Sequence, residues 1–131
     1  MQPKVVLANG CFDFFHIGHV WHLKAARKLG DVLIVSVTKD RSVNKGPGRP
    51  AFTCEQRAEM LEPYCDAVIF VDDALEALQK MDPDIFVKGP DYVDKIEPEH
   101  AAYCKARGIK IKFTKEPKHS SSDIIDRLRK S

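Results

Sequence analysis

The sequence lacks several features that would place it at once in a broad class of proteins. No segment approaches the roughly 18 to 20 apolar residues that a membrane span needs, and residues 1–10 lack the apolar region and cleavage site of a signal peptide. The four cysteines form no CxxC pair and no zinc-ribbon spacing. Neither sign of charge is in large excess, since the chain has 21 Lys and Arg and 19 Asp and Glu. These absences predict a cytoplasmic protein with reduced thiols that binds neither a membrane nor nucleic acid.

Short apolar runs and helical patterns alternate along the 131 residues, a length typical of one domain. The expected strands cover 5–8, 31–37, 67–71, 84–87 and 109–113, and the expected helices cover 19–29, 53–62, 73–81, 98–107 and 120–128. Four strands are apolar without alternation, which is typical of a sheet covered by helices on both faces. The prediction is therefore a single α/β domain over residues 1–131, doubly wound and Rossmann-like, with a five-stranded parallel sheet.

Three histidines, at positions 16, 19 and 22, follow the first expected strand. A shared metal ion is disfavoured, because on a helix His22 is turned about 120° away from His16. Packing explains His22, whereas His16 and His19 flank Gly18 where the strand turns into a helix. A helix N-terminus offers unpaired backbone N–H groups, and glycine lets a ligand approach the backbone closely. This part of the sequence therefore predicts a phosphate pocket.

Six ordered segments give the chain its resemblance to a known family. HIGH at 16–19 is shared by class I aminoacyl-tRNA synthetases and small nucleotidylyltransferases, but the chain is too short for a synthetase and has no KMSKS string. The wider set is NGCFDFFHIGH, LGDVLIVSV, KGPGRP, the QR at 56–57, VKGPDY and SSSDII. With these segments the chain resembles the cytidylyltransferase-like nucleotidylyltransferases. Within them it is most similar to adenylyltransferases that make ADP-heptose, and more distantly to glycerol-3-phosphate cytidylyltransferases.

The resemblance implies that a substrate phosphate oxygen attacks the α-phosphorus of ATP or CTP and that pyrophosphate leaves. The expected acceptor is a small phosphorylated sugar or polyol: heptose 1-phosphate with ATP, or alternatively glycerol 3-phosphate with CTP. Mg²⁺ is expected with the triphosphate, held by phosphate oxygens and water. Asp13 is the one protein ligand to be named, although fixing a loop through backbone hydrogen bonds suits it better. A homodimer is suggested, and similar enzymes often work beside a separate sugar kinase.

Roles for individual residues also follow from the resemblance. His16 and His19 are expected to hold the triphosphate, and Lys45 of the basic loop 39–50 to reach both reacting phosphates. Arg57 is expected at the substrate phosphate, with a surface ion pair as the alternative. The other expected nucleotide contacts are Asn9, Gly10, Cys11, Phe12, Gly18, Lys88, Gly89, Asp91, Ser120, Ser121 and Ser122. In this set, residues 88–91 are expected near the base and ribose, Phe12 also suits a plain core position, and the serines also suit a helix cap.

A catalytically silent nucleotide-binding module on the same fold is the alternative of another class. The presence of His16, His19, Lys45 and Lys88 weighs against it. A nicotinamide-binding domain is excluded because no GxGxxG follows any strand, and a Walker A motif is absent too. The unusual Trp21 and His22 leave the acceptor and the base preference open.

Overall fold

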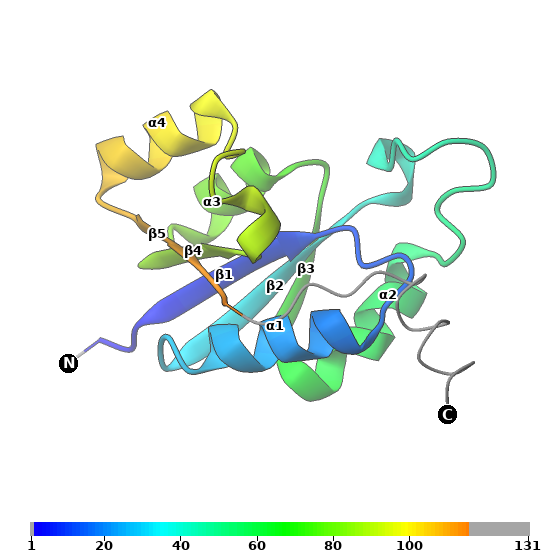
Figure 1. Ribbon diagram of the computed structural model, residues 1–131, viewed down its shortest axis with the longest axis horizontal. Helices are drawn as coiled ribbons and strands as arrows, with labels where there is room; N and C mark the ends of the chain where they lie inside the picture. Colours follow the sequence, from blue (N-terminus) through cyan, green and yellow to red (C-terminus); the bar gives the residue numbers. More distant parts are fainter. Residues whose placement is uncertain (1, 116–131) are drawn as a thin grey trace.

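A five-stranded sheet forms the centre of the computed structural model, which describes residues 2–115 except for the side chain of Asp91 (Figure 1). All of its strand pairs are parallel, and their order is β3-β2-β1-β4-β5. The strands are β1 (Val5–Gly10), β2 (Val32–Thr38), β3 (Ala67–Val71), β4 (Ile85–Lys88) and β5 (Lys110–Phe113). The helices are α1 (Ile17–Arg27), α2 (Cys54–Leu61), α3 (Ala74–Met81) and α4 (Pro98–Arg107), with short 3₁₀ turns η1 (Asp40–Ser42), η2 (Glu62–Tyr64) and η3 (Pro90–Tyr92). The predicted fold class is confirmed.

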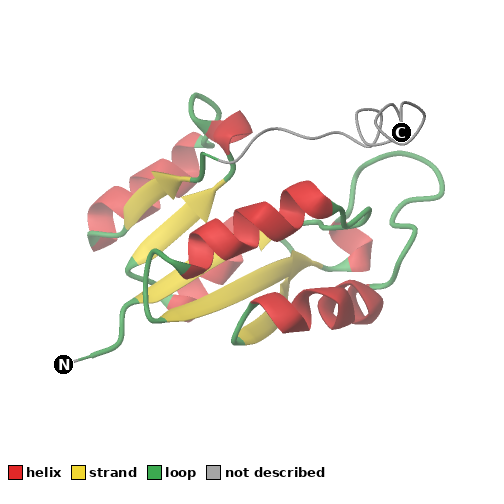
Figure 2. Ribbon diagram, turned by 60° about the horizontal axis from the view of Figure 1, so that its bottom comes forward, coloured by secondary structure: helices red, strands yellow, loops and turns green. Residues whose placement is uncertain are grey.

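Helices cover the sheet on both sides (Figure 2), which explains the uninterrupted apolar strands. Along β1, Val6 and Ala8 face one way, into a buried cluster that includes Leu23 of α1 and Leu61 of α2. Leu7 faces the other way, into a cluster built from α3 and α4. Because successive side chains of a strand point to opposite faces, both sets must be apolar when both faces are covered.

The strand order reverses beside β1. From β1 the chain runs outward through α1 and α2 to β2 and β3, and then returns through α3 and α4 to β4 and β5 on the other side. Strands β1 and β4 are neighbours, with Ala8 in register with Val87. The residues that follow them therefore flank the crevice in which this class of fold binds ligands.

The ends of the described elements lie within two residues of the sequence expectations. Helix α1 begins at Ile17 rather than near His19, because the side chain of His16 caps it. Helix α2 begins at the predicted capping box of Thr53 and Gln56, but after Leu61 the chain continues as a 3₁₀ turn through Pro63. The helix predicted over 120–128 lies outside the described residues. None of the helices in residues 2–115 has the length and apolarity needed to cross a membrane.

Candidate active site

The side chains of His16 and His19 cap the start of α1 by bonding to backbone groups. The N–H of Gly18 donates to Nδ1 of His16 over 3.0 Å, and the N–H of His16 donates to Nδ1 of His19 over 3.1 Å. The two ring centroids are 4.1 Å apart. Because each Nδ1 accepts a hydrogen bond, the proton of each neutral ring must be on Nε2. The helix start therefore fixes both imidazoles as Nε2–H donors.

Aromatic rings enclose His19. Phe15 stacks on it with centroids 5.5 Å apart, Phe12 meets it edge-on at 5.4 Å, and Tyr64 lies behind Phe15. Burial lowers the pKa of His19 to about 4, and the nearby charges of His16, His22 and Lys45 act in the same direction. The ring is therefore neutral at pH 7, as a hydrogen-bond donor of fixed tautomer should be.

The turn between β1 and α1 has an unusual backbone at Phe12, whose φ of 53° lies in the left-handed region. A bulky residue rarely adopts this conformation, which costs on the order of 1–3 kcal/mol and is found most often at functional sites. Phe12 is also 94% buried in the core cluster, which agrees with the core position that was its alternative expectation. A Cβ on Gly10 would lie 2.8 Å from the Phe12 ring, so the close packing in this turn requires glycine.

Asp13 holds the far end of the basic loop. Its carboxylate accepts hydrogen bonds from the backbone N–H groups of Ala51 (2.9 Å) and Phe52 (3.0 Å) and from Nε of Arg49 (2.5 Å). Burial opposes ionisation of Asp13, but these hydrogen bonds outweigh it and lower its pKa. The loop-fixing role expected from the sequence is thus observed. The carboxylate is 98% buried and already has three donors, so it does not suit a Mg²⁺ ligand.

Arg57 is fully buried, and it forms the ion pair that was the alternative expectation with Asp40, whose side chain is 44% exposed. Its guanidinium donates to the carbonyl oxygens of Cys11 (2.8 Å) and Phe52 (3.1 Å) and to the carboxylate of Asp40 (2.6 Å). One side chain therefore ties the β1–α1 turn to both ends of the basic loop. In this conformation the guanidinium is inaccessible to the substrate phosphate expected from the sequence.

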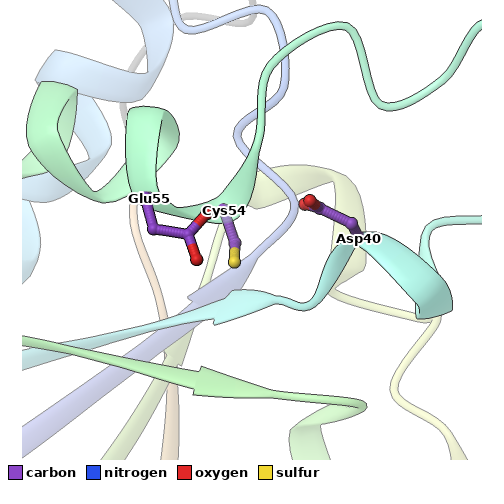
Figure 3. A group of neighbouring side chains, drawn as sticks. All are labelled: Asp40, Cys54 and Glu55. Atoms are coloured by element: carbon purple, nitrogen blue, oxygen red, sulfur yellow. The ribbon is translucent and has the colours of Figure 1, made fainter.

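The basic loop 39–50 is closed at its base and carries Lys45 exposed at its tip. Figure 3 shows Cys54 and Glu55, at the start of α2, facing Asp40 of η1 across this base. Ligating atoms of these three residues lie within 4.8 Å of one another. Among residues 2–115 they are the one set of three with such spacing, and the three histidines at 16, 19 and 22 do not form one. Asp40 is already bonded to Arg57.

The end of β4 supplies the remaining predicted residues. Lys88 is the last residue of β4, the strand next to β1, and Gly89 follows it. The amide of Asn9 donates to Oγ of Ser36 over 2.7 Å, which fixes its side chain at the crevice. Asp91 lies in η3, while Ser120, Ser121 and Ser122 lie outside the described residues. The structure thus brings the β1–α1 turn, the histidine pair, the base of the Lys45 loop and Lys88 to one edge of the sheet.

Two contacts at this edge were not expected from the sequence. Phe15 sets the plane of His19 by stacking on it, and Arg49 holds Asp13. The paired phenylalanines directly before HIGH were a usable signal for the first, because aromatic residues beside a histidine at a turn commonly pack on it. Nothing in the spacing of residues 13 and 49 indicates the second.

Comparison with known proteins places this geometry in context. The cytidylyltransferase-like family profile matches residues 7–127. Two proteins named "Bifunctional protein HldE" are similar to the chain. The one from Campylobacter jejuni (strain RM1221) is 46% identical over 98% of the chain, and the one from Helicobacter hepaticus is 42% identical over 99%. The chain spans only 28% and 27% of these relatives, respectively.

Solved structures agree with the fold. The lipopolysaccharide core biosynthesis protein from Thermoplasma volcanium superimposes with a TM-score of 0.74 and 27% identity, over 89% of this chain and all of that one. Pantoate-beta-alanine ligase from Francisella tularensis gives a TM-score of 0.68 over 98% of this chain and 70% of that one. Its 15% identity supports a shared fold alone.

Proposed function

The chain belongs to the cytidylyltransferase-like family, and from this premise we propose that it is a nucleotidylyltransferase domain spanning residues 1–131. It transfers a nucleoside monophosphate from a triphosphate to a sugar phosphate. The observation that carries the proposal is the reciprocal capping of His16 and His19, which fixes two Nε2–H donors at a helix N-terminus. Such a site offers donors and a positive dipole end to phosphate oxygens.

The chemistry needs no nucleophilic side chain. A phosphate monoester has a second pKa near 6, so its attacking oxygen is already anionic at neutral pH. The oxygen forms a bond to the α-phosphorus, the bond from that phosphorus to the β-phosphate oxygen breaks, and pyrophosphate leaves with the electron pair. Catalysis then consists of alignment and of neutralising charge on the phosphates. Neutral imidazole donors and the ammonium of Lys45 suit this task.

Mg²⁺ accompanies the triphosphate in this proposal and neutralises part of its charge. It would be held by phosphate oxygens and water, as is usual for this ion. Asp13 does not fit as a ligand, because its carboxylate is buried and bonded to the basic loop.

ATP and heptose 1-phosphate are our first choice of substrates, on the strength of the motif resemblance. The relatives named HldE are called bifunctional, and the chain corresponds to little more than a quarter of each. We therefore also propose that a partner activity, a sugar kinase, supplies the phosphorylated acceptor. Copies of this chain are proposed to form a homodimer.

The test is pyrophosphate release, measured with each of four nucleoside triphosphates and a panel of phosphorylated acceptors. We expect turnover with ATP and heptose 1-phosphate, and its loss in Lys45→Gln. The exposed Lys110 on β5 provides the matched control, and Lys110→Gln should behave as wild type. Turnover with CTP and glycerol 3-phosphate would overturn the choice of substrates. An absence of turnover with every pair would favour the silent nucleotide-binding module.

A further inference from the structure

The third histidine, His22, lies on α1 one helical turn after His19, and the proposed mechanism does not use it. Its half-buried ring contacts a residue 92 positions away, because its Nδ1 is 2.7 Å from Oγ1 of Thr114. Figure 1 shows the end of β5, which Thr114 directly follows, approaching α1. Packing, the role expected for His22 from the sequence, does not account for a hydrogen bond of this length.

Thr114 connects this contact with the end of β4. Only 5% of Thr114 is exposed, so its hydroxyl group needs a hydrogen-bond partner within the protein, and His22 provides one. The backbone N–H of Thr114 donates to the carbonyl oxygen of Lys88 over 3.0 Å. Two successive hydrogen bonds therefore join α1 to the last residue of β4.

The position of Lys88 depends on this connection. The register between β1 and β4 ends with Ala8 opposite Val87, one residue before Lys88. On its other side, Lys88 is in register with Phe113 of β5. Within residues 2–115, the sheet therefore holds Lys88 from the side of β5 and not from the side of β1. The crevice opens between β1 and β4 at this point.

The start of α1 forms the other wall of the crevice. His16 caps this helix and His19 lies in its first turn, and His22 follows about 4.5 Å further along the helix axis. Burial has the largest effect in lowering the pKa of His19, and the charge of His22 acts in the same direction, which reflects how close the two rings are. The contact between His22 and Thr114 thus lies beside the histidine pair.

We infer that His22 is a positioning residue for the transfer reaction, and that through Thr114 it sets the distance between the histidine pair and the end of β4. The inference rests on the proposed function, in which catalysis consists of alignment. His22 acts through Thr114 and does not touch the reacting phosphates. A displacement of about 1 Å can lower the rate of an aligned reaction about 100-fold, so this contact contributes to kcat more than to substrate affinity.

Two pairs of variants test this role. His22→Phe keeps a ring but removes Nδ1, and Thr114→Val keeps the shape but removes the hydroxyl group. We expect each to lower kcat for pyrophosphate release about 10- to 100-fold, while KM for the triphosphate changes by less than about threefold. His22→Asn and Thr114→Ser retain a polar atom at either end of the contact, and each should keep kcat within about threefold of wild type.

The double variant His22→Phe/Thr114→Val should be no slower than the slower single variant, because both changes remove the same contact. Ile109→Val, at a buried position just before β5, is the control: it should lower stability and leave kcat unchanged. Wild-type kcat in His22→Phe or Thr114→Val would overturn the inference. So would losses that multiply in the double variant, or a loss in Thr114→Ser as large as that in Thr114→Val.

Hydrogen exchange of the Thr114 amide needs no turnover, so it separates this inference from the proposed function. Exchange should be about 10-fold faster in His22→Phe than in the wild-type chain and unchanged in His22→Asn, with the amide of Val35 in β2 as the reference for global unfolding. Unchanged exchange in His22→Phe would overturn the inference even in an active enzyme. If exchange accelerates but no pair of substrates releases pyrophosphate, the proposed function fails and the link from His22 to the end of β4 stands.

Discussion

The backbone N–H of His16 donates to Nδ1 of His19, so the second imidazole supports the turn that carries the first. This relationship gives His19 two separable roles. Its Nδ1 stabilises the helix start, and its Nε2–H is the donor proposed to contact phosphate. The two nitrogen atoms can be tested independently.

His19→Asn and His19→Ala separate these roles. Asparagine places a side-chain oxygen near the position of Nδ1 but nothing at Nε2, whereas alanine removes both. We expect both variants to lose about 10²- to 10³-fold in kcat, as for one lost transition-state donor. Both variants lose the ring contacts with Phe12 and Phe15. His19→Ala should lose about 1 kcal/mol more unfolding free energy than His19→Asn, because only alanine also lacks the cap. Urea unfolding and pyrophosphate release are the measurements; unchanged kcat in His19→Asn would contradict the assigned role.

The unfolding free energy should decrease as the pH is lowered through the range in which His19 titrates. Its pKa is about 4 in the folded chain and 6.5 as the ordinary value. Between these values the unfolded chain binds a proton that the folded chain does not, so the unfolding free energy decreases as pH falls from 6.5 to 4. Urea unfolding at several pH values should show this decrease, and His19→Asn should show a smaller one. A histidine NMR titration with a midpoint near 6.5 for His19 would refute the prediction.

Asp13→Asn tests whether this residue acts through the loop or through a metal. The amide keeps one acceptor but turns a donor toward the donors of Arg49 and the backbone. We expect a loss of about 1–3 kcal/mol in unfolding free energy and a lower kcat. The Mg²⁺ concentration that gives half-maximal activity should not change. A large increase in that concentration would instead identify Asp13 as a metal ligand.

Arg57→Lys tests whether Arg57 holds the fold together or contacts substrate. Lysine cannot donate at once to Cys11, Phe52 and Asp40, so buried carbonyl oxygens lose their partners. We expect a loss of about 2–3 kcal/mol in unfolding free energy. Arg41 pairs with Asp72 on the surface, with 71% of its side chain exposed, so Arg41→Lys is the control and should cost less. A fully stable but inactive Arg57→Lys would favour a direct contact with substrate phosphate.

Much of the fold is predictable from local patterns. Apolar runs mark the strands, the Thr53–Gln56 box starts α2, and Gly108, with a φ of 73°, ends α4 as expected. The start of α1 was placed too late because histidine is not a usual capping residue. The strand order was not predictable in detail, since it depends on which strands pair across the whole chain.

The sequence predicts the site residues that belong to a motif, but not those whose position depends on packing between distant segments. HIGH indicates two histidines at a strand-to-helix turn, and their rings are adjacent. The burial of Arg57 depends on three partners that are distant in the sequence or on neighbouring turns. A weaker signal was available, because Arg57 is four residues before Leu61 and therefore shares the apolar face of α2.

The basic loop is pinned at both ends, at one end by Arg57 through Asp40 and at the other by Asp13 through Ala51 and Phe52. The tip between these anchors has no share in the core. The entropy of closing a loop grows slowly with its length, so residues inserted near Gly46 would cost little stability. The length of the basic loop can therefore change during evolution without a change in the sheet or in the turn that carries the histidines. Such a change would alter which acceptors Lys45 can reach.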